Sequence, residues 1–302
     1  MKVIVVGLPL FSKRFVEDIN QFSNTKELVF IDTYSSKFEL LKFLILLPFV
    51  DGVLSINGVT DNSGTLNYVL RWKKKLWMQW VGTDVLLASE RFAKDELLRK
   101  YIDYAYNVTD AKWLKEELAQ ANIEADENSY KFLDRPTVNL KKYDSIKVLS
   151  YVAKNRENFY GLNHIVKLAE SNPEITFNIV GTDSYHEKLP SNIILHGWVS
   201  HEEMYKMMSE HAIFIRLTDH DGYSASVIES MSLGCEVIAS HPFENAYVPN
   251  EENLIDKFQF VIEKIRDRGL LPNAENSNLY LKKFHKETVL KDLYHQLKKF
   301  YE

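Results

Sequence analysis

The sequence predicts an α/β fold of two doubly wound domains, each built on a parallel sheet. Short apolar runs rich in β-branched residues alternate with helical patterns along the chain, as in successive βαβ units. The alternation stops around residues 133–146, where Pro136 and mixed charges indicate a linker, and then starts again. The length of 302 residues also fits two domains.

The first series predicts a domain over residues 1–140. Each expected strand is followed by an expected helix, as in a doubly wound sheet. The strands are expected at 2–7, 27–33, 50–56, 75–82 and 105–108, and the helices at 15–22, 38–47, 63–75, 90–103 and 111–121.

The second series predicts a domain over residues 141–283 and a terminal helix over residues 284–302. The helical pattern that ends the chain covers residues 281–301. The strands of this domain are expected at 146–153, 175–181, 192–197, 212–217 and 235–240, and the helices at 161–171, 201–211 and 224–234.

Glycine is scarce, with 11 residues against the ~7% typical of proteins, so each position answers a local need. Gly7, Gly82, Gly181 and Gly197 directly follow apolar runs, and Gly222 comes a few residues after another. At the carboxyl end of a strand a glycine lets the backbone approach a ligand or turn sharply. Open α/β sheets bind ligands at that end. Plain strand-to-helix turns are the alternative.

Composition excludes several classes of protein. The net charge is −5, and neither half is basic, since residues 1–140 hold 18 basic and 19 acidic side chains of the 37 and 42 in the chain. A nucleic-acid partner is therefore not expected. A single cysteine, Cys235, excludes an intrachain disulfide or a multi-cysteine metal site and indicates a reducing compartment. With no signal-peptide pattern and no apolar run long enough to span a bilayer, we expect a cytoplasmic chain.

Common catalytic motifs are also absent from the sequence. The first strand is followed by one glycine where a dinucleotide fingerprint needs three, and no P-loop, GxSxG or HExxH pattern occurs. His196 and His201 have no matched metal-ligand partners, so we interpret them as surface or supporting residues.

The most informative segment is residues 216–240, where a strand ends in polar residues and a helix starts near Ser224. Ser224, Ala225 and Ser226 are small and would leave the helix N-terminus uncovered, which suits a diphosphate. Asp221 and Glu229, on either side of this turn, could reach one ligand. A plain N-cap at Ser224 and a surface role for Glu229 remain the alternative.

This segment resembles the acidic-x7-acidic signature of nucleotide-sugar-dependent glycosyltransferases of family four, in glycosyltransferases group 1. Asp221-Gly222-Tyr223-Ser224 and Glu229 to Ile238 carry the signature, with Asp for the usual first Glu, Ser230 for Ala and Glu236 for Pro. Further matching elements are residues 148–171, 177–181, 194–217 and 80–85, the last with Val81 where His is common. The resemblance is dense over 145–240 and thin elsewhere.

The resemblance implies a GT-B fold, in which two Rossmann-like domains face a cleft and the terminal helix can cross back to the first domain. It implies a retaining transferase that moves a sugar from a nucleotide-diphosphate sugar to a glycan or lipid-linked acceptor. The donor's own phosphate would take the acceptor proton, and no metal or other cofactor would be required. Its donor would bind between the domains.

Site residues follow from the same resemblance. Glu229 would bind the donor ribose, Asp221 would face the transferred sugar, and Lys154 and Arg156 would contact the phosphates. The family's usual loop cations are out of register here, because counting back from Gly161 places Tyr160 and Asn155 at their positions. The remaining donor residues would be Gly181, Gly197, Trp198, Val199, Gly222, Tyr223, Ser224, Ala225 and Ser226, and Asp84, Gly7, Leu8, Gly82 and Thr83 would approach from the first domain.

Several alternatives stay open. Asp219-His220-Asp221 is also a D-x-D pattern, typical of metal-dependent transferases of the GT-A fold. A sugar-nucleotide epimerase or a catalytically silent binding subunit could share the architecture. Residues 71–77, basic and aromatic, and the apolar residues 38–50 could seat the first domain on an anionic membrane, or they could be a helix end and a core helix. The oligomeric state, sugar and base stay open.

Overall fold

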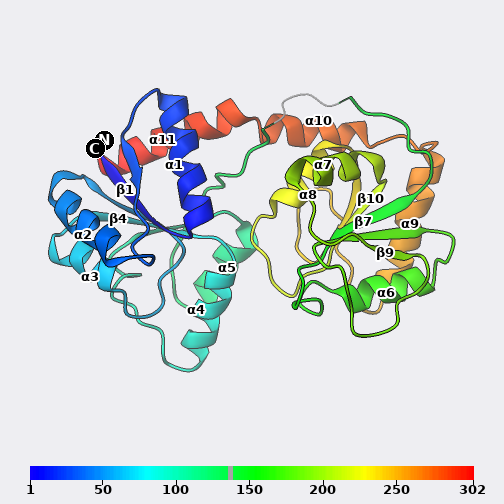
Figure 1. The fold of residues 1–302 in the computed structure, drawn as a ribbon, viewed down its shortest axis with the longest axis horizontal. Coiled ribbons are helices and arrows are strands. Elements are labelled where there is room, and N and C mark those ends of the chain that lie inside the picture. Colours follow the sequence, from blue (N-terminus) through cyan, green and yellow to red (C-terminus); the bar gives the residue numbers. More distant parts are fainter. Residues whose placement is uncertain (135–138) are drawn as a thin grey trace. The chain divides into compact units, whose positions relative to one another are not determined.

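A computed structural model describes residues 1–134 and 139–302. The chain forms two compact units: unit 1 comprises Met1–Phe132 and Lys286–Glu302, and unit 2 comprises Leu133–His285 (Figure 1). The first unit therefore ends at Phe132, where the sequence suggested residue 140, and the terminal helix belongs with unit 1 from Lys286 onward. Part of the expected linker, residues 135–138, lies outside the described residues.

Unit 1 contains a six-stranded parallel sheet in the order β2-β1-β3-β4-β5-β6. The strand β6, of two residues, was not expected from the sequence. The strands are β1 (Val3–Gly7), β2 (Leu28–Phe30), β3 (Gly52–Ile56), β4 (Lys75–Trp80), β5 (Tyr106–Thr109) and β6 (Asp126–Glu127).

The helices of unit 1 are α1 (Pro9–Ser23), α2 (Lys37–Leu46), α3 (Gly64–Arg71), α4 (Thr83–Ala93), α5 (Lys112–Gln120) and α11 (Lys286–Tyr301), with a 3₁₀ helix at Leu47–Phe49. Two expectations need correction. The first helix begins at Pro9 and not at residue 15, because proline suits the first helical position. The helix expected at 90–103 is α4. It starts earlier than expected because Asp84 accepts backbone hydrogen bonds at the N-terminus of the helix. It ends before Asp95, whose φ is 57°.

The terminal helix α11 packs with α1 on one face of the unit 1 sheet, although the two helices are far apart in sequence (Figure 1). Leu290, Leu293 and Leu297 of α11 belong to the same buried cluster as Val5 of β1. Tyr301 lies over Gly52, where an added Cβ would come within 2.5 Å of the tyrosine ring, and its hydroxyl donates to the Val53 carbonyl at 2.8 Å. A glycine is therefore required in β3 beneath this ring.

Unit 2 contains a five-stranded parallel sheet in the order β11-β10-β7-β8-β9. Its strands are β7 (Lys147–Tyr151), β8 (Thr176–Val180), β9 (Ile193–Leu195), β10 (Ile213–Arg216) and β11 (Glu236–Ala239), and its helices are α6 (Leu162–Glu170), α7 (His201–Glu210), α8 (Ala225–Ser232), α9 (Leu254–Asp267) and α10 (Ala274–Lys283). The helical pattern at the chain end is thus two helices, α10 and α11.

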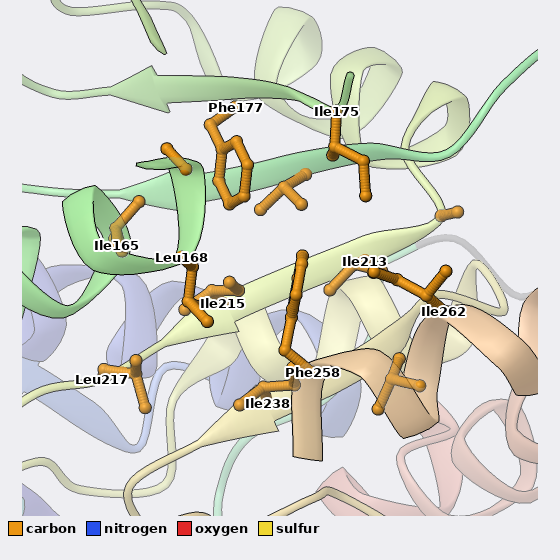
Figure 2. Packing of buried hydrophobic residues seen from close by; sticks show 14 of the residues in the cluster. Ile165, Leu168, Ile175, Phe177, Ile213, Ile215, Leu217, Ile238, Phe258 and Ile262 are labelled. Carbon is orange, nitrogen blue, oxygen red and sulfur yellow. The ribbon is translucent and has the colours of Figure 1, made fainter. Parts of the chain in front are cut away.

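Helix α9 was not expected, although its apolar residues have helical spacing. Leu254, Phe258, Val261, Ile262 and Ile265 are all buried on its inner side. They pack with α6 against one face of the unit 2 sheet (Figure 2). Phe258 stacks on Phe177 of β8 with ring centroids 5.8 Å apart. This core holds α6 and α9 against the sheet.

Glu236 explains one departure from the family pattern, in which proline is usual. Its side chain is 1% exposed and forms an ion pair of 2.7 Å with Arg268, the residue after α9. The Asn273 side-chain amide donates to the same carboxylate oxygen at 3.1 Å. The Glu236 backbone N–H also donates to the Ala212 carbonyl, a bond that proline would lack. Glu236 therefore joins β11 to the end of α9.

We expect Arg268→Ala to lower the free energy of unfolding by about 3 kcal/mol, because it leaves the Glu236 carboxylate buried without its cation. Equilibrium urea unfolding measures this difference. Arg266→Ala is the matched control, since Arg266 is an exposed arginine in the last turn of α9, two residues before Arg268. Equal effects of the two variants would contradict a structural role for the ion pair.

Candidate functional site

The predicted donor residues of unit 2 lie in the loops that follow parallel strands, at the carboxyl edge of the sheet. The loops after β8 and β9 are bonded to each other: the Gly181 N–H donates to the Gly197 carbonyl at 2.6 Å, and the Gly197 N–H donates to the Thr182 carbonyl at 3.0 Å. Gly181 has a φ of 103°, and a Cβ there would lie 2.5 Å from the Val152 carbonyl oxygen. A glycine is required for this close approach of three strand ends.

Lys154 reaches these two loops from the end of β7. Its Nζ forms an ion pair of 2.7 Å with Asp183, and a Cβ on Gly197 would lie 3.4 Å from the Asp183 side chain. The ion pair is exposed, so it contributes little to stability and leaves Lys154 accessible to a ligand. Trp198, which follows Gly197, is 83% exposed, and Val199 beside it is partly buried.

Arg156 has different partners from Lys154. Its guanidinium lies 4.1 Å from the centre of the Phe159 ring, in the same loop. It lines a pocket of about 310 Å³ together with Glu157, Tyr185 and His186. The structure therefore places the two expected phosphate-binding cations in the same loop, but holds each by its own contacts.

Arg216, at the end of β10, was not among the expected site residues. Its Nε donates to the Asp221 carboxylate at 2.7 Å, and its guanidinium lies 5.0 Å from the centre of the Tyr160 ring. The Asp219 N–H also donates to the Phe159 carbonyl at 2.9 Å, so the loops after β7 and β10 are joined. The sequence feature that could have identified Arg216 is its position as an arginine at the end of an otherwise apolar strand.

The start of α8 has no side-chain cap among the described residues. The Ser224 hydroxyl is hydrogen-bonded to the Ser226 hydroxyl at 2.9 Å instead, and Ala225 is exposed. Gly222 is buried and Tyr223 packs edge-on against Phe243 at 5.1 Å, which positions the turn before the helix. The first-turn amides and the helix dipole therefore favour an anion at this end.

Glu229, on the second turn of α8, is held by the first residue of α7. The His201 Nε2 and Glu229 Oε1 atoms are 2.8 Å apart, and the glutamate is partly buried. Asp221 and Glu229, which the resemblance assigns to one ligand, thus each contact a basic residue from a neighbouring element. His201 is a supporting residue of this carboxylate.

In unit 1, Asp84 is buried and its carboxylate accepts hydrogen bonds from the backbone N–H groups of four residues. The donors are the N–H groups of Gly58 at 2.5 Å, Val81 at 3.0 Å, Gly82 at 2.8 Å and Val85 at 3.1 Å. Burial raises the pKa of the Asp84 carboxyl, although these amides favour the charged form. These contacts place Asp84 as the anchor of the loop after β4.

The other expected residues of unit 1 lie at the carboxyl edge of its sheet. Gly7 ends β1, and the Leu8 N–H donates to the Ile56 carbonyl at 3.0 Å, which turns the chain into α1. Thr83 is exposed at the start of α4, whereas Val81 packs on the buried cluster beneath α11. A valine at position 81 therefore contributes to the core.

A comparison with known families agrees with this arrangement. Residues 147–263, from β7 into α9, match the family model of the glycosyl transferases group 1. This part of unit 2 is therefore similar to the glycosyl transferases group 1 domain. Within it lie Lys154, Arg216, Asp221 and Glu229, whereas no part of unit 1 is covered by the matched residues. None of the curated proteins shows significant sequence similarity to the chain.

Solved structures confirm the GT-B fold. The Anabaena protein HepE, in complex with UDP and glucose, matches with a TM-score of 0.69 and 10% identity over 99% of this chain and 100% of its own. A glycosyltransferase from Rickettsia africae matches with a TM-score of 0.68 and 13% identity over 100% and 99%. The pneumococcal O-GlcNAc transferase GtfA, in complex with UDP and GlcNAc, matches with a TM-score of 0.59 and 12% identity over 87% and 60%. The chain thus spans about three fifths of the length of GtfA.

In the group 1 domain, Arg216 lies next to a position where the resemblance implies a cation. Tyr160 occupies that sequence position, and the Arg216 guanidinium stands over its ring. A positive charge is therefore present in space where the sequence register supplies none.

We expect Asp84→Asn to destabilise unit 1 by about 1–3 kcal/mol, because the new amide replaces one acceptor oxygen with a donor among backbone N–H groups. Thermal unfolding with and without the substitution measures the loss. Thr83→Ala, at the exposed neighbouring position, is the control. Unchanged thermal stability of Asp84→Asn would contradict the anchoring role of Asp84.

Proposed function

We propose that this protein is a glycosyltransferase that transfers a sugar from a nucleotide-diphosphate sugar to a glycan or lipid-linked acceptor. The observation that carries the proposal is the start of α8 in the group 1 domain. This uncapped helix end stands between two carboxylates, Asp221 and Glu229, that are each fixed by a basic partner. A diphosphate with sugars on both sides has the matching distribution of charge and hydroxyl groups.

In the proposed complex, Glu229 accepts hydrogen bonds from the donor ribose. Its Oε1 is held by His201, so the carboxylate is oriented before the donor arrives. The first-turn amides of α8, with Lys154 and Arg156, bind the phosphates. Gly197, Trp198 and Val199 flank the base at the end of β9, where Gly181 keeps the backbone close.

Arg216 joins this proposal as a further phosphate-facing cation. It is 11% exposed, and its contact with Asp221 places a positive and a negative group at the end of β10. The guanidinium would stabilise the charge that grows on the leaving diphosphate, while Asp221 would lie near the anomeric carbon. Charge-assisted contacts in a partly buried position are stronger than those of an exposed lysine.

The proposed transfer retains the configuration at the anomeric carbon. The bond between that carbon and the diphosphate oxygen breaks, and the acceptor hydroxyl forms a new bond on the same face. The hydroxyl proton passes to a phosphate oxygen of the departing nucleotide. The proposal requires no metal, since Arg216 already pairs with the second carboxylate of the D-x-D pattern.

UDP is the first nucleotide to examine, since HepE and GtfA were solved in complex with it. Two other functions could share the architecture, and the fate of the donor distinguishes them from a transferase. A sugar-nucleotide epimerase would release an epimerised donor, and a silent binding subunit would bind the donor without consuming it.

We expect UDP and UDP-sugars, with EDTA present, to raise the thermal midpoint of the wild-type protein, and Glu229→Ala to remove that shift. Ligand at 100 times its Kd stabilises by about 2.7 kcal/mol, which a thermal-shift assay detects. Glu210→Ala, an exposed glutamate of α7, is the matched control and should keep the shift. If no nucleotide shifts the wild-type midpoint, the proposed donor site is wrong. If a shift appears only with added metal, the proposal that no metal is required is wrong.

Product analysis tests the reaction itself. Proton NMR of the sugar transferred to water or to an acceptor reports the anomeric configuration. Retention supports the proposed step, and inversion contradicts it. Release of an epimerised UDP-sugar would identify an epimerase, and binding without turnover would identify a silent subunit.

We expect Arg216→Gln and Asp221→Asn each to lower kcat/KM by roughly 100-fold, the cost of removing one oriented charge from such a site. Because Arg216 and Asp221 contact each other, the double variant should lose much less than the product of the two single losses. Steady-state kinetics of the three variants measures this coupling. Additive losses would show that the two side chains act independently.

A further inference from the structure

Helix α2 has apolar side chains on two faces. One face is buried in unit 1, and the other is exposed to solvent. Phe43 is fully buried in unit 1, and Leu47 just beyond the helix is buried as well. On the opposite side Phe38, Leu41 and Ile45 are 73%, 53% and 58% exposed, and Phe49 of the following 3₁₀ helix is 73% exposed. We name these four residues the α2 stripe. An apolar helix face is normally covered by another part of the protein or by a partner.

The structure joins the α2 stripe to the basic segment at the end of α3. The Lys74 Nζ donates to the Pro48 carbonyl at 3.0 Å and to the Val50 carbonyl at 2.7 Å. Residues 71–73 therefore lie beside the end of the stripe, with Trp72 49% exposed. Helices α2 and α3 are labelled together in unit 1 of Figure 1.

The charge around the stripe is positive. Residues 37–51 and 71–75 contain six basic side chains and two acidic ones, Glu39 and Asp51. Glu39 pairs with Lys42, and Asp51 accepts a backbone N–H from Lys2. Within the part of the chain that the structure describes, Lys37, Arg71 and Lys73 form no ion pair; we name these three the basic flank.

We propose that the α2 stripe and the basic flank bind the surface of an anionic lipid bilayer. Exposed phenylalanine and leucine side chains at one helix face enter the boundary between head groups and acyl chains, while lysine and arginine contact anionic head groups. Tryptophan, as at position 72, is enriched at that depth. The proposed contact is peripheral; no helix of the described residues has the length and apolar character to cross a bilayer. This inference does not depend on the transferase activity.

Vesicle flotation of the full chain tests the proposal, with phosphatidylcholine vesicles compared with vesicles that also contain phosphatidylglycerol. We expect binding to the anionic vesicles only, weakened by salt. Phe38→Ser with Phe49→Ser, and separately Arg71→Glu with Lys73→Glu, should each weaken binding about tenfold or more. Donor-induced thermal shifts should persist in all of these variants, which separates this test from that of the proposed function.

Matched controls are available on other surfaces. Ile255→Ser with Phe260→Ser removes two side chains that are 44% and 46% exposed on α9, and Lys26→Glu with Lys115→Glu reverses two exposed charges of unit 1. These variants should bind vesicles as the wild type does. The proposal is wrong if the wild type does not bind anionic vesicles, or if Phe38→Ser with Phe49→Ser leaves binding unchanged. It is also wrong if light scattering shows a dimer that this variant abolishes, because a second copy of the chain would then cover the α2 stripe.

Discussion

The parallel direction of β7, β8, β9 and β10 is the constraint on which the candidate site depends. It brings four loops to one edge of the unit 2 sheet, and backbone hydrogen bonds between Gly181, Gly197 and Thr182 hold two of them together. The core beneath, where Phe177 and Phe258 stack, fixes the strands that carry these loops (Figure 2). The sheet therefore positions loop residues that are distant in sequence close enough together to contact one ligand.

Electrostatic pairing gives this edge its second property. Asp221 forms an ion pair with Arg216 and Glu229 is hydrogen-bonded to His201, so both carboxylates are held in fixed positions near an anion-favouring helix end. The same principle acts away from the site, where Arg268 neutralises the buried Glu236. The departure from the family pattern at position 236 is thus explained by a local ion pair rather than by the chemistry of the site.

Unit 1 shows a different balance between packing and exposure. One face of its sheet is closed by α1 and by α11, which returns from the end of the chain. Helix α2 buries Phe43 but leaves the α2 stripe in solvent. The sequence offered both interpretations of residues 38–50, a core helix or a surface for membranes, and the structure shows that one helix has both an inner core face and an outer apolar face.

Periodicity in the sequence alone determined the fold class and the positions of most strands, because alternation and apolar runs are local properties. The segment around Asp221 and Glu229 was predicted as a donor site only through its resemblance to a known family. Periodicity did not determine the start of α4, which depends on Asp84 and its hydrogen bond from the Gly58 amide, 26 residues away in sequence. Nor did it identify Arg216 or the carboxylate that His201 supports, since such contacts depend on which loops become neighbours across the sheet. Tertiary structure decided these features because they arise from contacts between distant segments, which no local pattern contains.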